Sequence, residues 1–167
     1  TYTVTGTSPE GCTGTAQIQI VVHPLPNITA NTNNAEICVG ESADLTAGSD
    51  VAGTTWEWST GQTTNPITVS PVTTTTYTVT GTTPDGCTGT AQVTVIVHPN
   101  PVVDINSSAL EICDQASADL TATSSIPGTT WEWSTGQTTN PITVSPNTTT
   151  TYTVTGTSPE GCTGTAQ

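Results

Sequence analysis

Five cysteines are the residues of this chain best suited to form covalent bonds. Cys12, Cys87 and Cys162 follow a glycine in the phrase GC, whereas Cys38 and Cys113 end the phrase EIC. The sequence contains no CxxC motif and no Cys/His cluster, so disulfides in an oxidising compartment are expected instead of a metal site. The expected pairs are Cys38–Cys87 and Cys113–Cys162, with a partner for Cys12 upstream of the sequence.

An alternative pairing depends on where these cysteines lie in the fold. A bond between Cys38 and Cys87 closes a loop of 49 residues, which stabilises by about 4 kcal/mol through the loss of chain entropy. Bridged Cα atoms, however, lie within about 7 Å of each other. If the two cysteines lie at opposite ends of a domain, the alternative is a bond from Cys38 to Cys162 that joins two successive domains.

The 13 acidic residues are accompanied by no lysine or arginine, and the net charge is −13. Proteins bind nucleic acids and anionic membrane surfaces through basic side chains, so neither is expected as a partner. The acids lack the DxDxDG spacing of a calcium loop, so no metal site or cofactor is predicted. Glu10, Asp50 and Asp85 are weak candidates for loosely bound Ca²⁺.

Two histidines, His23 and His98, lie alone in proline-rich stretches. No serine or cysteine nucleophile is arranged around them, so no catalytic residue is assigned and the chain is not expected to be an enzyme. No run of about 18 apolar residues occurs, so no membrane insertion is predicted.

Tryptophan occurs twice in each of two copies of the phrase TWEW. The chain has no Phe or Met, so Trp and Tyr are its only aromatic residues. A small domain needs such side chains in its core, and in a strand the two tryptophans of a copy point to one face. The alternative is a platform on which a glycan stacks. The predicted core aromatics are Trp56, Trp58, Tyr77, Trp131, Trp133 and Tyr152.

These residues recur at a constant spacing of 75. The phrase TYTVTG begins at Thr1, Thr76 and Thr151, and TTWEWSTGQTTNPITVSP occurs twice without a difference. An unbroken register over many positions indicates tandem repeats. Prolines in HPLPN and HPNP interrupt strand pairing and mark boundaries. The predicted domains are 1–24, the end of a preceding repeat; 25–99, a complete repeat; and 100–167, a repeat without its last strand. We call them the N-terminal, middle and C-terminal segments.

Short alternating runs of Thr with Val, Ile and Tyr are typical of half-buried strands. The turn phrases SPEG and TPDG, with Pro followed by Gly, join the last two strands of a repeat as a hairpin. No helical periodicity is present. Six or seven short strands in one repeat predict an all-β fold of β-sandwiches. In the middle segment the predicted strands are 27–32, 36–39, 44–47, 54–59, 66–70, 75–82 and 88–97.

The order of the phrases EIC, SADLTA, WEWSTG, PITVSP, TYTVTG and DGC resembles the tandem immunoglobulin-like or PKD-like repeats of large surface adhesins and filament proteins of gliding bacteria. The acid-rich glycine loop of many PKD domains is absent, so the immunoglobulin-like type fits better. The resemblance implies a secreted protein at a bacterial cell surface, with a role in adhesion or filament building. It carries no catalytic residues to transfer.

A structural role is therefore expected. Sandwiches joined end to end by short proline-containing linkers form a stiff array in which each domain contacts mainly its neighbours. We expect a section of an extracellular fibre or adhesin stalk whose partners are further copies of itself. The alternative is an adhesive module that binds glycans, other cells or Ca²⁺. Because the chain begins and ends inside strand patterns, it is interpreted as an excerpt of a longer protein.

One stretch is a candidate for contact between subunits. IQIVVHP at 18–24 has the pattern of VTVIVHP at 93–99, the last strand of the complete repeat. If the subunits are separate molecules, its alternate residues Ile18, Ile20 and Val22 complete a repeat of another subunit by strand donation. If the chain is an excerpt of a longer one, the corresponding strand follows covalently.

Overall fold

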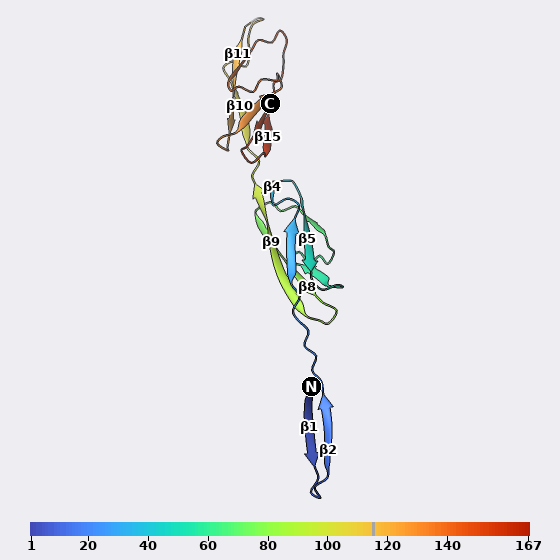
Figure 1. The fold of residues 1–167 in the computed structure, drawn as a ribbon. Coiled ribbons are helices and arrows are strands. Elements are labelled where there is room, and N and C mark those ends of the chain that lie inside the picture. Colours follow the sequence, from blue (N-terminus) through green and yellow to red (C-terminus); the bar gives the residue numbers. More distant parts are fainter. Residues whose placement is uncertain (115) are drawn as a thin grey trace. The chain divides into compact units, whose positions relative to one another are not determined.

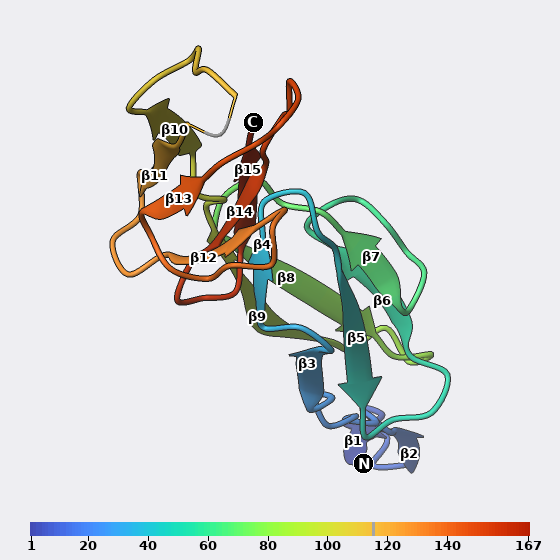
Figure 2. The same cartoon turned by 90° about the horizontal axis from the view of Figure 1, so that it is seen from above.

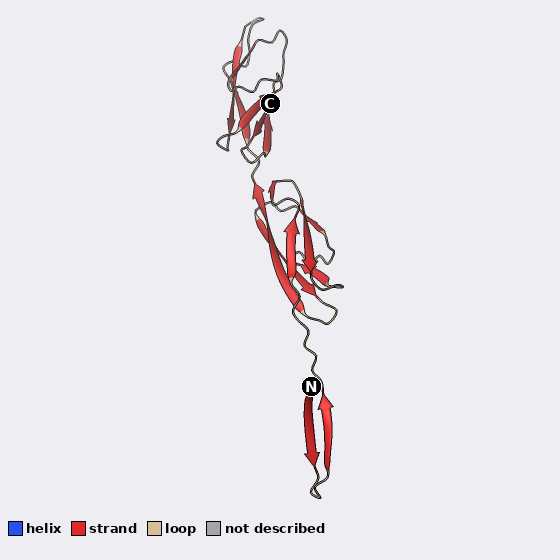
Figure 3. Cartoon of the chain, viewed as in Figure 1, coloured by secondary structure: helices blue, strands red, loops and turns tan. Residues whose placement is uncertain are grey.

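The computed structural model describes residues 1–114 and 116–167, in which every regular element is a strand (Figures 1 and 3). Contacts divide these residues into two compact units. Unit 1 comprises residues 1–30, 47–65 and 78–92, and unit 2 comprises residues 31–46, 66–77 and 93–167. The boundary crosses the middle segment, so each set of contacts below belongs to one unit.

The strands follow the three segments in order. In the N-terminal segment, β1 (Tyr2–Thr7) pairs antiparallel with β2 (Thr13–Ile18). The middle segment contains β3 (Ile28–Thr32), β4 (Glu36–Cys38), β5 (Ala43–Ser49), β6 (Thr55–Trp58), β7 (Ile67–Val69), β8 (Thr75–Thr82) and β9 (Thr88–His98). The C-terminal segment contains β10 (Val103–Ser107), β11 (Ala118–Ser124), β12 (Thr130–Trp133), β13 (Ile142–Val144), β14 (Val154–Thr157) and β15 (Thr163–Ala166).

The strand order is that of an immunoglobulin-type sandwich. The middle segment has sheets of order β3-β5-β7 and β4-β9-β8-β6, and the C-terminal segment has sheets of order β10-β11-β13 and β12-β14-β15 (Figure 2). An immunoglobulin sandwich likewise divides its strands between one sheet with strands A, B and E and another with strands C, F and G. The all-β prediction is confirmed, and the sheets are consistent with a β-sandwich.

Alternation along the strands explains which residues are buried. In β8 the phrase TTYTVTGT buries Tyr77 and Val79, while the threonines between them remain half or fully exposed. In β5 and β11 the phrase ADL buries its alanine and leucine. The core of the C-terminal segment contains Val103, Leu120, Ala122, Trp133, Ile142, Val144 and Val154.

The predicted strands of the middle segment are all present, with small shifts at their ends. The C-terminal segment differs at the counterparts of β4 and of the first half of β8, since β14 begins only at Val154. Glu36–Cys38 form β4, which runs parallel to the end of β9. The corresponding residues 111–113 form no strand in the part of the chain that the structure describes. A strand needs a hydrogen-bonding neighbour, and β15 ends at Ala166, before the counterpart of the residues that pair with β4.

An asparagine takes the place of a strand neighbour beside β5 and again beside β11. The Asn65 side chain accepts a hydrogen bond from the Ala47 N–H and donates one to the Ala47 carbonyl, each at 2.8 Å. Asn140 makes the same two contacts with Ala122, also at 2.8 Å. One amide thus satisfies both backbone groups of the facing residue.

Replacing Asn65 with alanine should lower the free energy of unfolding by about 1–3 kcal/mol, since both backbone groups of the half-buried Ala47 lose their partner. Urea unfolding followed by far-UV circular dichroism measures the effect. Thr63→Ala, at an exposed position nearby, is the matched control and should leave the midpoint unchanged. Equal midpoints for the two variants would show that the amide bridge adds no stability.

Candidate functional site

A tight turn presents each cysteine of the GC phrase. At Ser158–Cys162 the Ser158 N–H donates to the Cys162 carbonyl at 2.8 Å, and the Cys162 N–H donates to Ser158 Oγ at 3.2 Å. Gly161 closes the turn with φ of +86°, in the left-handed region that glycine adopts without strain. The same bonds form in the turns at 8–12 and 83–87. The phrase therefore places the thiol of each copy in the same local geometry.

Cys38, the other half of the bond, is positioned by β4. This short strand runs parallel to the end of β9, and Cys38 lies opposite His98. The Val39 N–H donates to the His98 carbonyl at 3.0 Å, and Glu41 accepts a hydrogen bond from the Cys38 N–H at 2.9 Å. The backbone of Cys38 is therefore fixed on both sides of the residue.

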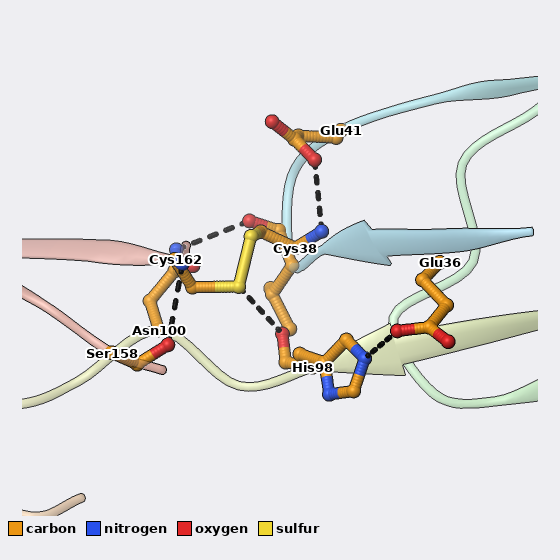
Figure 4. The surroundings of a disulfide bond; sticks show 8 residues. Glu36, Cys38, Glu41, His98, Asn100, Ser158 and Cys162 are labelled. Carbon is orange, nitrogen blue, oxygen red and sulfur yellow. Dashed lines mark hydrogen bonds and ion pairs between the residues drawn. A yellow bond between two sulfur atoms is a disulfide. The ribbon is translucent and has the colours of Figure 1, made fainter. Parts of the chain in front are cut away.

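The structure joins Cys38 to Cys162 (Figure 4). Their Cα atoms are 5.5 Å apart, and 124 residues of sequence separate them. Cys162 is buried, and its Sγ lies 3.9 Å from the carbonyl oxygen of His98. The His98 carbonyl is thus next to both halves of the bond, and the disulfide ties a strand of the middle segment to a turn of the C-terminal segment.

Polar side chains surround the disulfide and hold the exit from β9 in place. His98 Nε2 lies 3.0 Å from Glu36 Oε2, and Asn100 Nδ2 donates to the Val39 carbonyl at 3.1 Å (Figure 4). The sequence analysis left His98 without a role. Its constant spacing from the cysteines of both phrases was the signal that could have placed it beside them.

The expected pairs Cys38–Cys87 and Cys113–Cys162 are wrong in this structure, and the alternative pair Cys38–Cys162 is the one formed. Cys38 lies beside the last residue of β9, whereas Cys87 immediately precedes its first residue, Thr88. At about 3.3 Å per residue, the ends of this strand are about 33 Å apart, far beyond the reach of a disulfide. Cys12, Cys87 and Cys113 carry free thiols.

Cys87 has the surroundings of Cys162 without a bonded partner. Its Sγ lies 3.9 Å from the carbonyl oxygen of His23, and its N–H donates to Thr83 Oγ1 at 3.1 Å. Asp85 Oδ2 lies 3.1 Å from His23 Nδ1. The turn and the histidine carbonyl are present in this copy, but no strand of the EIC type lies beside them among the described residues of unit 1.

A groove of about 740 Å³ opens in the C-terminal segment. Tyr152 and Ile112 on its wall are half-buried, and Leu110 is 94% exposed. Its apolar lining residues are Ile105, Ala109, Leu110, Ile112, Cys113, Ala118, Leu120, Val144, Pro146 and Tyr152. The groove therefore combines an apolar floor with a rim formed by residues 147–151 and Gln167.

The corresponding positions of the middle segment are covered. Ile37 is 3%, Leu45 is 0% and Tyr77 is 8% exposed. Val95, in the second half of β9, is 0% exposed, and the Thr76 and Thr94 hydroxyls are 2.8 Å apart. The C-terminal segment has no described counterpart of this half-strand, which leaves its groove open.

The three residues proposed for contact between subunits are exposed. Ile18 is 63%, Ile20 is 59% and Val22 is 85% exposed. Neighbouring Val21 is 64% exposed, so a continuous apolar run lies in solvent.

The tryptophans divide into two classes. Trp58 and Trp133 are 1% and 2% exposed, and each indole N–H donates to a backbone carbonyl, that of Thr64 at 3.2 Å and that of Thr139 at 3.0 Å. Trp56 and Trp131 are half-buried. The second tryptophan of each TWEW phrase is thus a fully buried core residue, and the first lies at the core margin.

The half-buried Trp131 has a glycine as its neighbour across the sheet. Trp131 lies opposite Gly156, and a Cβ at that glycine would be 3.0 Å from the indole ring. The ring also packs against the core of the C-terminal segment. Its open side faces a hollow of about 550 Å³ that includes Glu132. Because the ring is held by packing, core formation explains this tryptophan better than glycan stacking does.

The acidic residues considered for Ca²⁺ lie apart or have other partners. Asp50 accepts a hydrogen bond from the Asn27 N–H at 2.9 Å, and Asp85 lies beside His23. Glu10 is exposed on the β1–β2 turn. Across residues 1–114 and 116–167, no three His, Cys, Asp or Glu side chains are grouped closely enough to hold a metal ion. No helix long and apolar enough to span a membrane occurs in the same residues.

Among the solved structures that match this chain are two of low sequence identity. No protein-family model matches the sequence, and neither does any curated protein. Murine CEACAM1b aligns with 80% of this chain and 93% of its own at 14% identity, with a TM-score of 0.40. A structure of a 1.5-MDa bacterial ice-binding adhesin aligns with 98% of this chain and 70% of its own at 20% identity, with a TM-score of 0.41. Identities this low carry no information about shared function.

Proposed function

We propose that this chain is a structural section of an extracellular bacterial fibre or adhesin stalk, built from tandem immunoglobulin-like sandwiches of 75 residues. The sequence spacing supports it, as do the corresponding strands of the two larger segments, which begin at Ala43 and Ala118, at Thr55 and Thr130, and at Ile67 and Ile142. Elements repeated at one spacing are typical of linear arrays in which neighbours stabilise each other.

An extracellular location at a bacterial surface is part of the proposal. The disulfide between Cys38 and Cys162 supports an oxidising compartment. The absence of Lys and Arg, with a net charge of −13, favours a soluble chain that repels nucleic acid and anionic lipid. Further copies of the repeat are the partners that the exposed apolar surfaces fit best.

The groove of the C-terminal segment carries the proposal. It leaves Ile112 and Tyr152 half-uncovered, whereas their counterparts Ile37 and Tyr77 are buried in the segment that has a complete β9. An exposed apolar surface is a site where a further protein element packs, and a strand that adds to a sheet is one such element. We infer that a strand with the pattern of β9 fills the groove.

The proposed occupant is residues 18–24 of a second copy of this chain. Aligned with β9, Ile20 takes the place of Val95, which is 0% exposed, and Val21 takes the place of Ile96, which is 39% exposed. The acceptor keeps its own hairpin of β14 and β15, so the donor contributes only residues from Ile18 onward.

Ile20→Asp should prevent assembly, because it would bury a carboxylate in the groove. Ile20 is exposed in the single chain, so the variant should fold normally. The matched control is Val21→Asp, which places the same charge at the outward-facing position and should still assemble. Sedimentation velocity of the two variants measures the effect. If both variants assembled equally, residues 18–24 would not fill the groove with Ile20 facing inward.

The fibre itself is tested by electron microscopy and by intact mass. Purified assemblies should be linear, with a repeat of one or two sandwich lengths, about 35 or 70 Å. After reduction and denaturation, a mass near 17.0 kDa would support donation between molecules. A much larger mass would show that the strand is supplied within one covalent chain and would exclude donation between molecules. Compact particles without a linear repeat would contradict the structural role.

A further inference from the structure

We propose that the free cysteines Cys113 and Cys87 form a disulfide between successive copies, so that the fibre is covalently linked along its length. The inference rests on the proposed function and adds the chemistry that locks each junction. In the pairing that it specifies, the EIC cysteine of one repeat bonds to the GC cysteine of the following repeat. Within the chain, Cys38–Cys162 is one such bond.

Three parts make the bond between Cys38 and Cys162. The strand β4 presents Cys38 opposite His98, the SPEG turn presents Cys162, and the His98 carbonyl lies next to both. The parts recur in the sequence: EIC and HP repeat at the spacing of 75, and at that spacing the SPEG turn is matched by TPDG. Glu41, which accepts a hydrogen bond from the Cys38 N–H, has Ala116 as its counterpart.

Unit 1 contains two of these parts already assembled. The Cys87 Sγ lies 3.9 Å from the His23 carbonyl oxygen, the same separation as that between Cys162 Sγ and the His98 oxygen. Residues 21–23, the counterparts of the β9 residues that pair with β4, form no strand. Compared with the bonded site, this site lacks a parallel EIC strand with its cysteine, and Leu25 stands in the place of Asn100.

The missing part is exposed in the C-terminal segment. Cys113 is a free, exposed thiol at the end of the EIC phrase, and residues 111–113 form no strand. If residues 18–24 of the next copy fill the groove, 111–113 gain the parallel neighbour that β4 has in β9. Cys113 then lies opposite His23 of the donor, whose carbonyl already lies beside Cys87. The two thiols meet without any change in the turn that carries Cys87.

The bond requires an oxidant, for which we specify the disulfide of a small thiol such as oxidised glutathione. The Cys113 thiolate attacks one sulfur of that disulfide and releases one small thiol, forming a mixed disulfide. The Cys87 thiolate then attacks the Cys113 sulfur and releases the second small thiol. Two protein thiols and one small disulfide thus become one protein disulfide and two small thiols.

Peptide mapping under non-reducing conditions tests the pairing. The chain contains no Lys or Arg, so cleavage after Glu replaces trypsin, and it separates the cysteines into peptides of different mass. The peptide 112–132, which contains Cys113, should be linked to 58–111, which contains Cys87. Assemblies from equal amounts of ¹⁴N- and ¹⁵N-labelled chains, mixed under oxidising conditions, should give isotopically mixed pairs. The inference would be overturned if 112–132 were linked to the peptide that begins at Gly11 or to the one that begins at Gly161. It would also be overturned if the pairs were not isotopically mixed, or if Cys113 remained a free thiol.

Serine variants provide the matched comparison. Cys113→Ser and Cys87→Ser should each abolish multimers that resist detergent without reductant, whereas Cys12→Ser should leave them unchanged. Microscopy of the same samples separates the two proposals. Linear assemblies that lack the Cys113–Cys87 link would overturn the covalent junction alone. Samples without linear assemblies would overturn the proposed function and the junction together.

Discussion

Replacing Trp58 with alanine should lower the free energy of unfolding by about 3–5 kcal/mol. The side chain is 1% exposed, so its removal leaves a large cavity. The Thr64 carbonyl also loses the hydrogen bond of 3.2 Å that it accepts from the indole N–H. The chain has few alternatives to fill the space, because it contains no Phe or Met. Urea unfolding followed by far-UV circular dichroism measures the loss.

The control for Trp58 is the neighbouring residue on the same strand. Glu57 is exposed between the two tryptophans, so Glu57→Ala should change stability by less than about 0.5 kcal/mol. Trp133→Ala should behave like Trp58→Ala in the C-terminal segment, where the residue is 2% exposed. A loss for Trp58→Ala no greater than that for Glu57→Ala would show that the indole is not a core residue.

Opening the Cys38–Cys162 disulfide is the second large effect. The bond closes a loop of 124 residues, which corresponds to about 5 kcal/mol of chain entropy when the whole loop unfolds. We expect the double variant Cys38→Ala/Cys162→Ala to unfold at a lower urea concentration than the oxidised parent. The parent after addition of a reductant should match the variant.

Cys12→Ala is the control for the disulfide, since this thiol is free and exposed. Its midpoint should equal that of the parent, and reductant should lower both by the same amount. An unchanged midpoint on reduction of the parent would contradict a stabilising role for the bond between the middle and C-terminal segments.

The strands were predictable because their causes are local. Alternation of Thr with apolar residues and the SPEG and TPDG turns predicted β8 and β9 with nearly the observed bounds. Each signal acts over a few residues, as propensity and turn geometry do.

The disulfide pairing was not predictable in the same way. It depends on β4 running parallel to the far end of β9, which places Cys38 about one strand length from Cys87. Strand direction and neighbour are properties of the whole sheet. The spacing of 75 allowed both pairings, and only the arrangement around His98 distinguishes them.

The tryptophans show a finer difference of the same kind. Period-2 alternation places Trp56 and Trp58 on one face, yet only Trp58 is fully buried. β6 is the last strand in the order β4-β9-β8-β6, and Trp56 lies near its start, opposite Gly81. Trp58 lies on the same strand, opposite Val79, so their different burial depends on position along the strand, which period-2 alternation does not predict.

The groove was not predicted from the sequence. The prediction of a C-terminal repeat without its last strand did not show which residues such a strand would cover. The structure identifies them through the half-buried Ile112 and Tyr152.

Electron cryomicroscopy of the assembled chain, at a resolution that shows side chains, tests the proposed assembly most directly. The predicted map has residues 18–24 of one copy in the groove of the next, parallel to residues 111–113, with Ile20 against Leu120 and Tyr152. A map in which the groove is empty, or is filled by any other part of the chain, would contradict the account.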